Sequence, residues 1–353
     1  MMDGSLGEYF SQKCNNLILM HLVAAFAVIY VHVSAVTGNG PADFFLQLVG
    51  YKFIGGIAFD IFFVISGFLV TASALGRNGL LYYVMSRLLR IYPILIICVT
   101  LTVFLLGPAL TASSTYWSTQ QSWSYLWRNT TAFSTEYFLP GMFADAHDKA
   151  VNGSLWSLAI ELRLYLIVLI LAAFGILKNC AVFNLLFFLA LVTVYFFSRN
   201  MDATISPLKS FARSHEVLDW KLCLDELCCH PDQSCTLVGT SFFFAASQHL
   251  TPEFGVAYAL LLPYLGFYLT FAPGVAWFNR FGDYSYGVYL YGWIAQQIVL
   301  LLNPEMTNTL NVLYSCTLAL ALATTSWHFG RKTNIAFKGT VQADKLIRQS
   351  PFF

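Results

Sequence analysis

Charged residues are scarce in this chain. Of its 353 residues, 10% are charged and 58% are apolar, whereas about one quarter of the residues in a soluble domain carry charge. So few charges cannot cover a water-facing surface, which excludes an ordinary soluble domain. The 19 basic and 18 acidic residues nearly cancel, so the charge balance indicates neither a nucleic-acid partner nor an acidic tail.

Heptad runs, internal repeats and long soluble segments are also missing, and long apolar runs stand in their place. A helix needs about 20 mostly apolar residues to cross roughly 30 Å of hydrocarbon. Such runs occupy residues 17–37, 53–75, 91–110, 154–177, 181–197, 254–272, 285–302 and 310–329, with weaker stretches at 116–140 and 236–248. The predicted fold class is an all-α polytopic membrane protein, a bundle of about 8–10 transmembrane helices.

Basic residues predict the orientation, because Lys and Arg gather in cytoplasmic loops. The short loop between the second and third runs carries Arg77, Arg87 and Arg90. The C-terminal segment adds Arg331, Lys332, Lys338, Lys345 and Arg348. We therefore expect a transmembrane domain over residues 1–330, a cytoplasmic tail over 331–353, both termini inside and an even number of crossings. The first run lacks a small-residue cleavage site, which indicates a retained helix rather than a signal peptide.

Two polar segments raise the question of a metal site. In the loop at 111–153, Asp145, His147 and Asp148 are sequential rather than at helix-facing spacing, so a solvated loop is the preferred interpretation. Segment 212–235 contains Cys223, Cys228, Cys229, His230 and Cys235. Its interpretations are a zinc knuckle, a polar loop with reduced cysteines, or a stretch translated from a shifted reading frame. No metal site is predicted.

Ionisable residues inside apolar runs are functional candidates, because each costs several kcal/mol unless it is paired or hydrated. His21 and His32 are eleven residues apart in the first run, which places them within about 20° of one helix face and about 16 Å apart along the axis. Asp60 lies in the second run and could orient a histidine by accepting its ring N–H. The alternative for each histidine is a structural hydrogen bond to a neighbouring helix, and the alternative for Asp60 is a polar contact that packs two helices. Ser66, beside Gly67, fits close helix approach better than nucleophilic catalysis.

Four further charged residues lie in or beside the apolar runs, and two of them have two interpretations. Arg87 and Arg90 share a helix face at the expected cytoplasmic edge, where guanidinium groups can bind phosphates or simply hold the loop inside. Glu161 lies two turns into the run at 154–177 and is followed by Arg163. Side chains two residues apart point away from each other on a helix, so we expect Glu161 and Arg163 to find separate partners.

Four sequence blocks resemble one known family. They read FDIFFVISGFLVTA at 59–72, SRLLRIYP at 86–93, VNGSLWSLAIELRLYL at 151–166 and FGDYSYGVYLYG at 281–292. In this order they are similar to the acyltransferase 3 family of membrane O-acyltransferases, especially its branch that modifies bacterial exopolysaccharides. The resemblance implies an O-acetyltransferase of the bacterial inner membrane.

The resemblance also implies roles for individual residues. His32 matches the acyl-transfer histidine of the family's first helix, and His21 stands where the family has an arginine. Gly292 replaces a histidine that many members carry. The predicted catalytic residues are His32, Asp60 and Glu161. The predicted substrate- or donor-binding residues are His21, Arg87, Arg90, Ser66, Trp156 and Tyr286.

By this resemblance, an acyl group, most simply acetyl, passes from acyl-CoA to a hydroxyl of a surface or exported polysaccharide. The expected partners are a polysaccharide or lipid-linked glycan acceptor, the acyl-CoA donor and membrane lipid, without nucleic acid. Acetyl-CoA is expected as a co-substrate, and no bound cofactor is expected. The alternatives are a proton-coupled transporter or flippase of a glycan or lipid-linked sugar, with His32, Asp60 and Glu161 as a proton relay, and an inactive relative.

Overall fold

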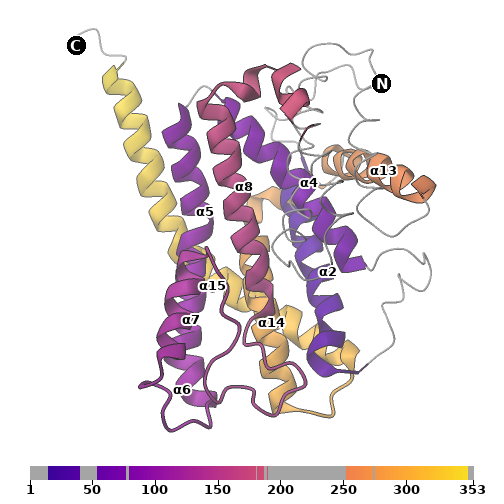
Figure 1. Ribbon diagram of the computed structural model, residues 1–353, viewed down its shortest axis with the longest axis vertical. Helices are drawn as coiled ribbons and strands as arrows, with labels where there is room; N and C mark the ends of the chain where they lie inside the picture. Colours follow the sequence, from indigo (N-terminus) through magenta and orange to yellow (C-terminus); the bar gives the residue numbers. More distant parts are fainter. Residues whose placement is uncertain are drawn as a thin grey trace. The chain divides into compact units, whose positions relative to one another are not determined.

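The computed structural model describes residues 15–39, 54–76, 79–179, 181–186, 189, 252–272 and 275–348. Its elements are α2 (Leu17–Thr37), α4 (Ile54–Leu75), α5 (Gly79–Leu101), η1 (Thr102–Leu106), α6 (Gly107–Leu110), α7 (Gln120–Thr131), η2 (Gly153–Leu155), α8 (Trp156–Ala173), η3 (Ile176–Lys178), α13 (Pro252–Phe271), η5 (Ala276–Phe281), α14 (Ser285–Leu302) and α15 (Asn308–Arg348) (Figure 1). This part of the chain contains helices and no strand, which confirms the predicted all-α class.

Five helical segments in the described part are long and apolar enough to cross a membrane. They are Leu17–Thr37, Ile54–Leu75, Gly79–Leu110, Gly153–Ala173 and Asn308–His328. A shorter apolar helix covers Leu261–Phe271. The polytopic membrane fold is therefore confirmed.

One expected span is too short in the structure, and other sequence expectations are not tested or lie outside the described residues. The weak stretch at 116–140 contains only the 12-residue α7, which at about 18 Å is too short to cross a bilayer. Helix α15 continues through residue 330 to Arg348, and the boundary between the transmembrane domain and the cytoplasmic tail at that residue stays a prediction. Arg77, segment 212–235, the stretch 236–248 and most of the run at 181–197 lie outside the described residues.

The chain divides into two compact units. Unit 1 comprises residues 1–31, 40–84 and 156–283, and unit 2 comprises residues 32–39, 85–155 and 284–353. The continuous helices α2 and α5 each pass from one unit to the other, so neighbouring residues on one helix can belong to different units.

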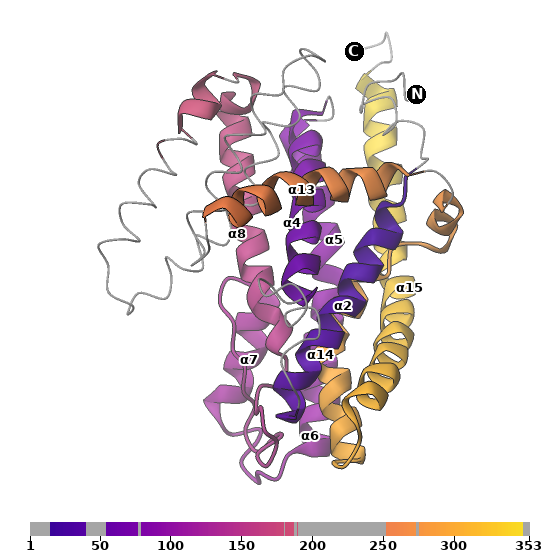
Figure 2. The same cartoon turned by 90° about the vertical axis from the view of Figure 1, so that its right-hand side faces the viewer.

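Unit 1 is built around α4, which contacts both α8 and α13. Figure 2 shows α13 crossing α4. On one side Phe63 packs with residues of α8, and on the other the rings of Phe68 and Phe267 meet edge to face at 5.2 Å. Helix α4 also approaches α2 closely, because a Cβ atom at Gly55 would fall 2.8 Å from Val31 Cγ2. Large aromatic side chains and one glycine thus set the packing of this unit.

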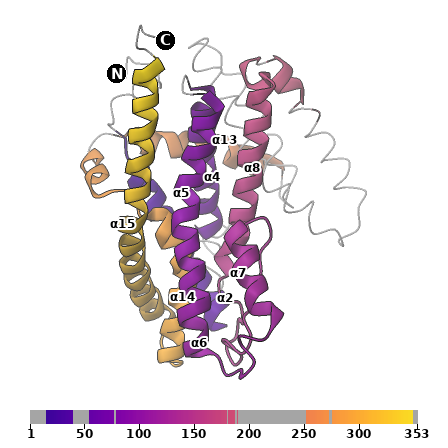
Figure 3. The same cartoon turned by 90° about the vertical axis from the view of Figure 1, so that its left-hand side faces the viewer.

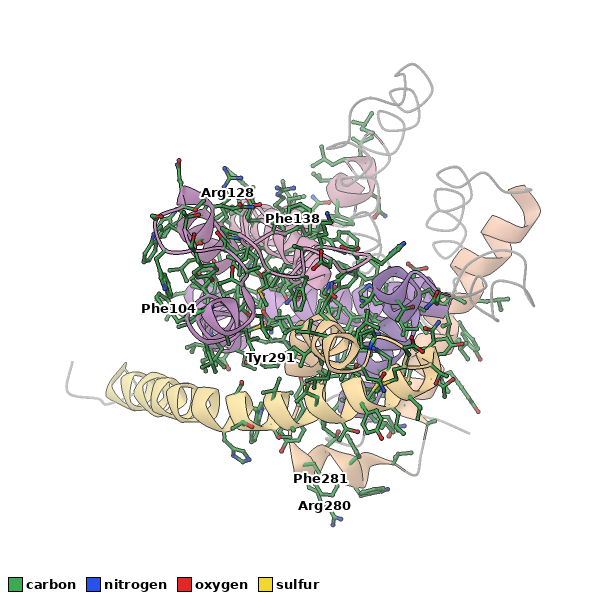
Figure 4. The ribbon with its side chains drawn as sticks, turned by 90° about the horizontal axis from the view of Figure 1, so that it is seen from below. Phe104, Arg128, Phe138, Arg280, Phe281 and Tyr291 are labelled. Carbon is green, nitrogen blue, oxygen red and sulfur yellow. The ribbon has the colours of Figure 1, made fainter. Side chains whose placement is uncertain are left out.

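Unit 2 contains the hairpin of α14 and α15 (Figure 3). The two helices cross at small residues, since a Cβ atom at Gly287 would lie 2.7 Å from the Cβ atom of the fully buried Ala323. Tyr291 and Ser326 share a hydroxyl hydrogen bond of 2.6 Å at the same interface. Seen from below in Figure 4, Tyr291 lies beside α15. Small-residue contacts and hydrogen bonds of this kind are typical of helix pairs in membranes.

Candidate active site

His32 is packed against an aromatic ring in unit 2. Its imidazole is half-buried and meets the indole of Trp293 edge to face, with ring centroids 4.9 Å apart. Within the described part of the chain, neither ring nitrogen of His32 has a hydrogen-bond partner. The ring is therefore positioned by packing, while its nitrogens stay available to a proton or an acyl group.

Trp293 is itself held from two sides. Its indole Nε1 donates to the carbonyl oxygen of Ala150 at 3.0 Å, and the side chain is only 6% exposed. Gln297, one turn later on α14, donates from Nε2 to the carbonyl oxygens of Ala150 at 3.0 Å and Asp148 at 2.7 Å. On the other side, a Cβ atom at Gly153 would fall 2.7 Å from Trp293 Cζ3. The ring fits because residue 153 is a glycine.

The whole segment from residue 148 to residue 154 is fastened to α14. Asn152 donates from Nδ2 to the carbonyl oxygen of Leu290 at 2.9 Å. Tyr289 donates from its hydroxyl to the carbonyl oxygen of Ser154 at 3.0 Å. A loop backbone tied at this many points cannot easily move, so the ring that contacts His32 is fixed by a rigid surrounding.

Sequence reasoning missed Trp293 and Gln297. The sequence does contain an indication of their role. Residues four apart on a helix share a face, so the indole of Trp293 and the amide of Gln297 place two hydrogen-bond donors on the same side of the helix. Gly292, the position where the family resemblance expects a histidine, immediately precedes Trp293. The structure thus provides an aromatic partner for His32 at the position next to the missing histidine.

The other predicted residues of unit 2 lie on two helices. Tyr286 is buried in the first turn of α14. Arg87 and Arg90 are half-buried on α5, and their spacing places them on one face of that helix. Their assignment to the acyl donor stays a prediction.

Unit 1 holds His21, Asp60 and Ser66 in its interior. All three are buried. The imidazole of His21 meets the ring of Phe62 on α4 edge to face at 5.0 Å. The hydroxyl oxygen of Ser66 is buried without a hydrogen-bond partner among the described residues. Burial of polar groups in an apolar helix pair is costly, so each of these residues remains a candidate for function.

Glu161 and Trp156 come from α8 in the same unit. The hydroxyl of Tyr165, one turn later, donates to Glu161 Oε1 in a short hydrogen bond. Arg163 points to the exposed side of α8, as the two-residue spacing predicts. Trp156 stacks on Phe59 of α4, with centroids 5.5 Å apart. This contact of Glu161 was readable from sequence, since Tyr165 stands four residues after it.

Two of the residues considered for a metal site, Asp148 and His147, contact backbone groups instead. Asp148 Oδ1 accepts the backbone N–H of Ala150 at 2.8 Å, and His147 Nδ1 lies 3.1 Å from the carbonyl oxygen of Ala35. Within the described ranges, no group of three His, Cys, Asp or Glu side chains is placed to hold a metal ion. The cysteine-rich segment 212–235 lies outside those ranges.

Comparison with known proteins identifies the class. Residues 15–207, more than half of the chain, match the acyltransferase 3 family, described as an acyltransferase domain. The chain belongs to this family. It is therefore a multi-pass membrane acyltransferase, which uses an acyl donor and a hydroxyl-bearing acceptor.

One characterised relative extends the comparison to nearly the full length. The O-acetyl transferase of Shigella phage Sf6 is 28% identical over 348 residues, which cover 91% of this chain and 96% of the relative. No solved structure matches the chain. The predicted family and the predicted enzyme class, an O-acetyltransferase, are thereby confirmed.

Proposed function

We propose that this protein transfers acetyl groups from acetyl-CoA to a hydroxyl of a surface or exported polysaccharide, within the bacterial cytoplasmic membrane and with both termini in the cytoplasm. The name of the phage relative supports acetyl as the acyl group. The basic residues near span ends support the orientation. The acceptor class comes from the sequence blocks that resemble the exopolysaccharide branch.

The state of His32 carries this proposal. An imidazole on an apolar helix, packed on a buried indole and with no hydrogen-bond partner in the described part of the chain, is costly for a purely structural residue. A structural histidine in a membrane helix normally bonds a neighbouring helix. His32 instead keeps both nitrogens for chemistry.

His32 would act at the transfer step. A neutral imidazole nitrogen accepts the proton of the acceptor hydroxyl while that oxygen attacks the thioester carbonyl of acetyl-CoA. The new C–O bond forms, the C–S bond breaks, and the proton passes from His32 to the departing coenzyme A thiolate. In a second route the same nitrogen carries the acetyl group between donor and acceptor. Asp60 and Glu161 are the proposed supporting carboxylates.

Arg87 and Arg90 would bind the phosphates of coenzyme A. Two guanidinium groups on one helix face can each form paired hydrogen bonds with phosphate oxygens. Changing both to Gln should raise KM for acetyl-CoA without altering membrane insertion. Arg128, exposed on α7 and paired with Glu136 at 3.7 Å, provides the matched control, and Arg128→Gln should leave KM unchanged.

A proton-coupled transporter remains the competing function for the same buried groups. The family match favours group transfer, because its members are acyltransferases. Purified protein that releases free coenzyme A only when a glycan acceptor is present would support transfer. Glycan translocation without any consumption of acetyl-CoA would support transport.

The cellular test uses a strain that lacks the gene and is complemented with variants at equal protein level. We expect His32→Ala to abolish O-acetyl groups on the glycan. His328→Ala, which removes an exposed histidine of α15 in the same unit, should leave them intact. Undiminished acetylation with His32→Ala would remove His32 from the chemistry.

A further inference from the structure

The polarity of α7 is inverted relative to a helix on a water-soluble surface. Its inner face presents Ser122 and Asn129, which are 0% and 2% exposed, together with the buried Tyr125. Its outer side presents Trp123 and Trp127, which are 48% and 72% exposed, with the exposed Gln120 at one end of the helix and the exposed Arg128 near the other. A helix packed under water would bury its indoles and expose its polar side chains. The uncovered face of α7 is thus suited to an apolar surrounding.

The two buried polar side chains Ser122 and Asn129 are satisfied inside the protein. Ser122 donates from Oγ to the carbonyl oxygen of Tyr116 at 2.5 Å. Asn129 donates to the carbonyl oxygen of Glu136 at 2.9 Å and accepts its backbone N–H at 3.0 Å. Arg128, the one charged residue in this helix, pairs with Glu136 at 3.7 Å. Such internal pairing is what hydrocarbon requires of polar groups.

The neighbouring helix fixes the depth at which α7 lies. The candidate span beside α7 is Gly79–Leu110, and residues 91–110, after Arg90, contain no charged side chain. From Arg90 to Leu110 the segment is continuous and about 30 Å long at roughly 1.5 Å per residue, which equals the thickness of the hydrocarbon core. Figures 1 and 3 show α7 beside this segment, and α7 contacts η1. At one end of α7, Trp123 lies 6.3 Å from Phe104, centroid to centroid. At the other end, Tyr92 donates to the carbonyl oxygen of Thr131 at 3.1 Å.

The exposed aromatic rings continue the lipid-facing surface of that span. Phe104 is exposed on the outer side of the span, as is the next residue, Leu105; Figure 4 shows Phe104 at this margin. Trp117 stacks on Phe104, with centroids 5.6 Å apart, and accepts a hydrogen bond at its carbonyl oxygen from Trp123 Nε1. The aromatic face of α7 and the side of the span therefore form one apolar surface.

We propose that α7 is a re-entrant half-helix whose outer face, Trp123 and Trp127, contacts the acyl chains of the membrane. The segment leaves the span at Leu110, turns back beside it and returns on the same side. It adds no crossing of the membrane.

Photocrosslinking tests the position of α7 in reconstituted vesicles of phosphatidylethanolamine and phosphatidylglycerol. Benzoylphenylalanine is placed singly at Trp127, at Leu105 as the lipid-facing reference, and at Lys149 as the exposed reference from the polar end of the same loop. We expect acyl-chain adducts at Trp127 as abundant as those at Leu105 and several times those at Lys149. Adducts at the Lys149 level, adducts on lipid headgroups alone, or crosslinks to a second protein copy would overturn the proposal.

A second measurement keeps the test decisive if a crosslinking variant does not fold. Tryptophan fluorescence of the wild type and of Trp127→Phe is compared in vesicles with lipids brominated on the acyl chain. The wild type should show the larger quenched fraction, because Trp127 contributes quenchable emission. Equal quenched fractions would contradict contact between Trp127 and the chains. Neither experiment depends on acetyl transfer.

Discussion

Replacing Gly153 with alanine would press a methyl group against the indole on which His32 rests. The new Cβ atom would fall 2.7 Å from Trp293 Cζ3 and 2.8 Å from both Cε3 and Cη2, closer than side-chain carbon atoms come in folded proteins. The backbone of Gly153 does not have a positive φ, so alanine adopts it and the effect is purely steric. The ring must shift, and His32 must shift with it.

The size of the effect follows from overpacking. Forcing one extra carbon into a filled site costs about 1–3 kcal/mol, and about 1.4 kcal/mol in the activation barrier changes a rate tenfold. If the displacement reaches His32, Gly153→Ala should lower the acetyl-transfer rate by about 5- to 150-fold. KM for acetyl-CoA should change little, since the Arg87 and Arg90 face of α5 is untouched.

A second substitution separates this mechanism from general damage. The three crowded atoms all belong to the six-membered ring of the indole, and phenylalanine at residue 293 is too short to occupy their place. Trp293→Phe alone loses the donor to Ala150, whose carbonyl oxygen still receives Gln297 Nε2 at 3.0 Å. The double variant Gly153→Ala with Trp293→Phe should therefore be faster than the product of the two single effects predicts.

The assay is release of free coenzyme A by purified variants, with thermal unfolding recorded in parallel. Gly266→Ala is the matched control, because its Cβ atom would meet only Val64 Cγ1 at an ordinary 3.6 Å. Wild-type rates in Gly153→Ala, or strictly additive losses in the double variant, would refute the idea that Trp293 positions His32.

Two other sets of contacts can be tested by substitution. Arg87→Gln with Arg90→Gln should raise KM for acetyl-CoA at least tenfold while kcat changes less; the reverse pattern in steady-state kinetics would count against phosphate binding. Tyr165→Phe removes the donor to Glu161 and should lower the unfolding free energy by about 1–3 kcal/mol in a detergent thermal melt; an unchanged melt would contradict this.

Sequence periodicity and composition were sufficient to predict the helical membrane fold. Apolar runs such as 17–37 and 53–75 coincide with α2 and α4 because a span must be apolar throughout its length. The stretch at 116–140 has the aromatic content of a weak span, but its helix, α7, is too short to cross a bilayer. Its polar residues Ser122 and Asn129 face the protein interior, and an averaged hydropathy value does not show which side of a helix is polar. Only the structure reveals which side of a mixed helix is covered.

The local part of the candidate site was also accessible from sequence. The contact of Glu161 with Tyr165 follows from a four-residue spacing on one helix. The contact of His32 with Trp293 could not be predicted, because it joins distant parts of the chain through tertiary packing. The glycine that makes room for that indole, Gly153, reads in sequence only as part of a turn before α8.

Label transfer from acetyl-CoA by purified protein is the direct test of whether His32 catalyses acetyl transfer to the glycan. Wild-type protein, His32→Ala and His328→Ala are each given acetyl-CoA labelled in the acetyl group together with the isolated glycan. We expect labelled O-acetyl glycan from the wild type and His328→Ala, and a rate about 10²- to 10⁴-fold lower from His32→Ala, the usual contribution of a general base. Labelling by His32→Ala at the wild-type rate, or no labelling by the wild type, would contradict it.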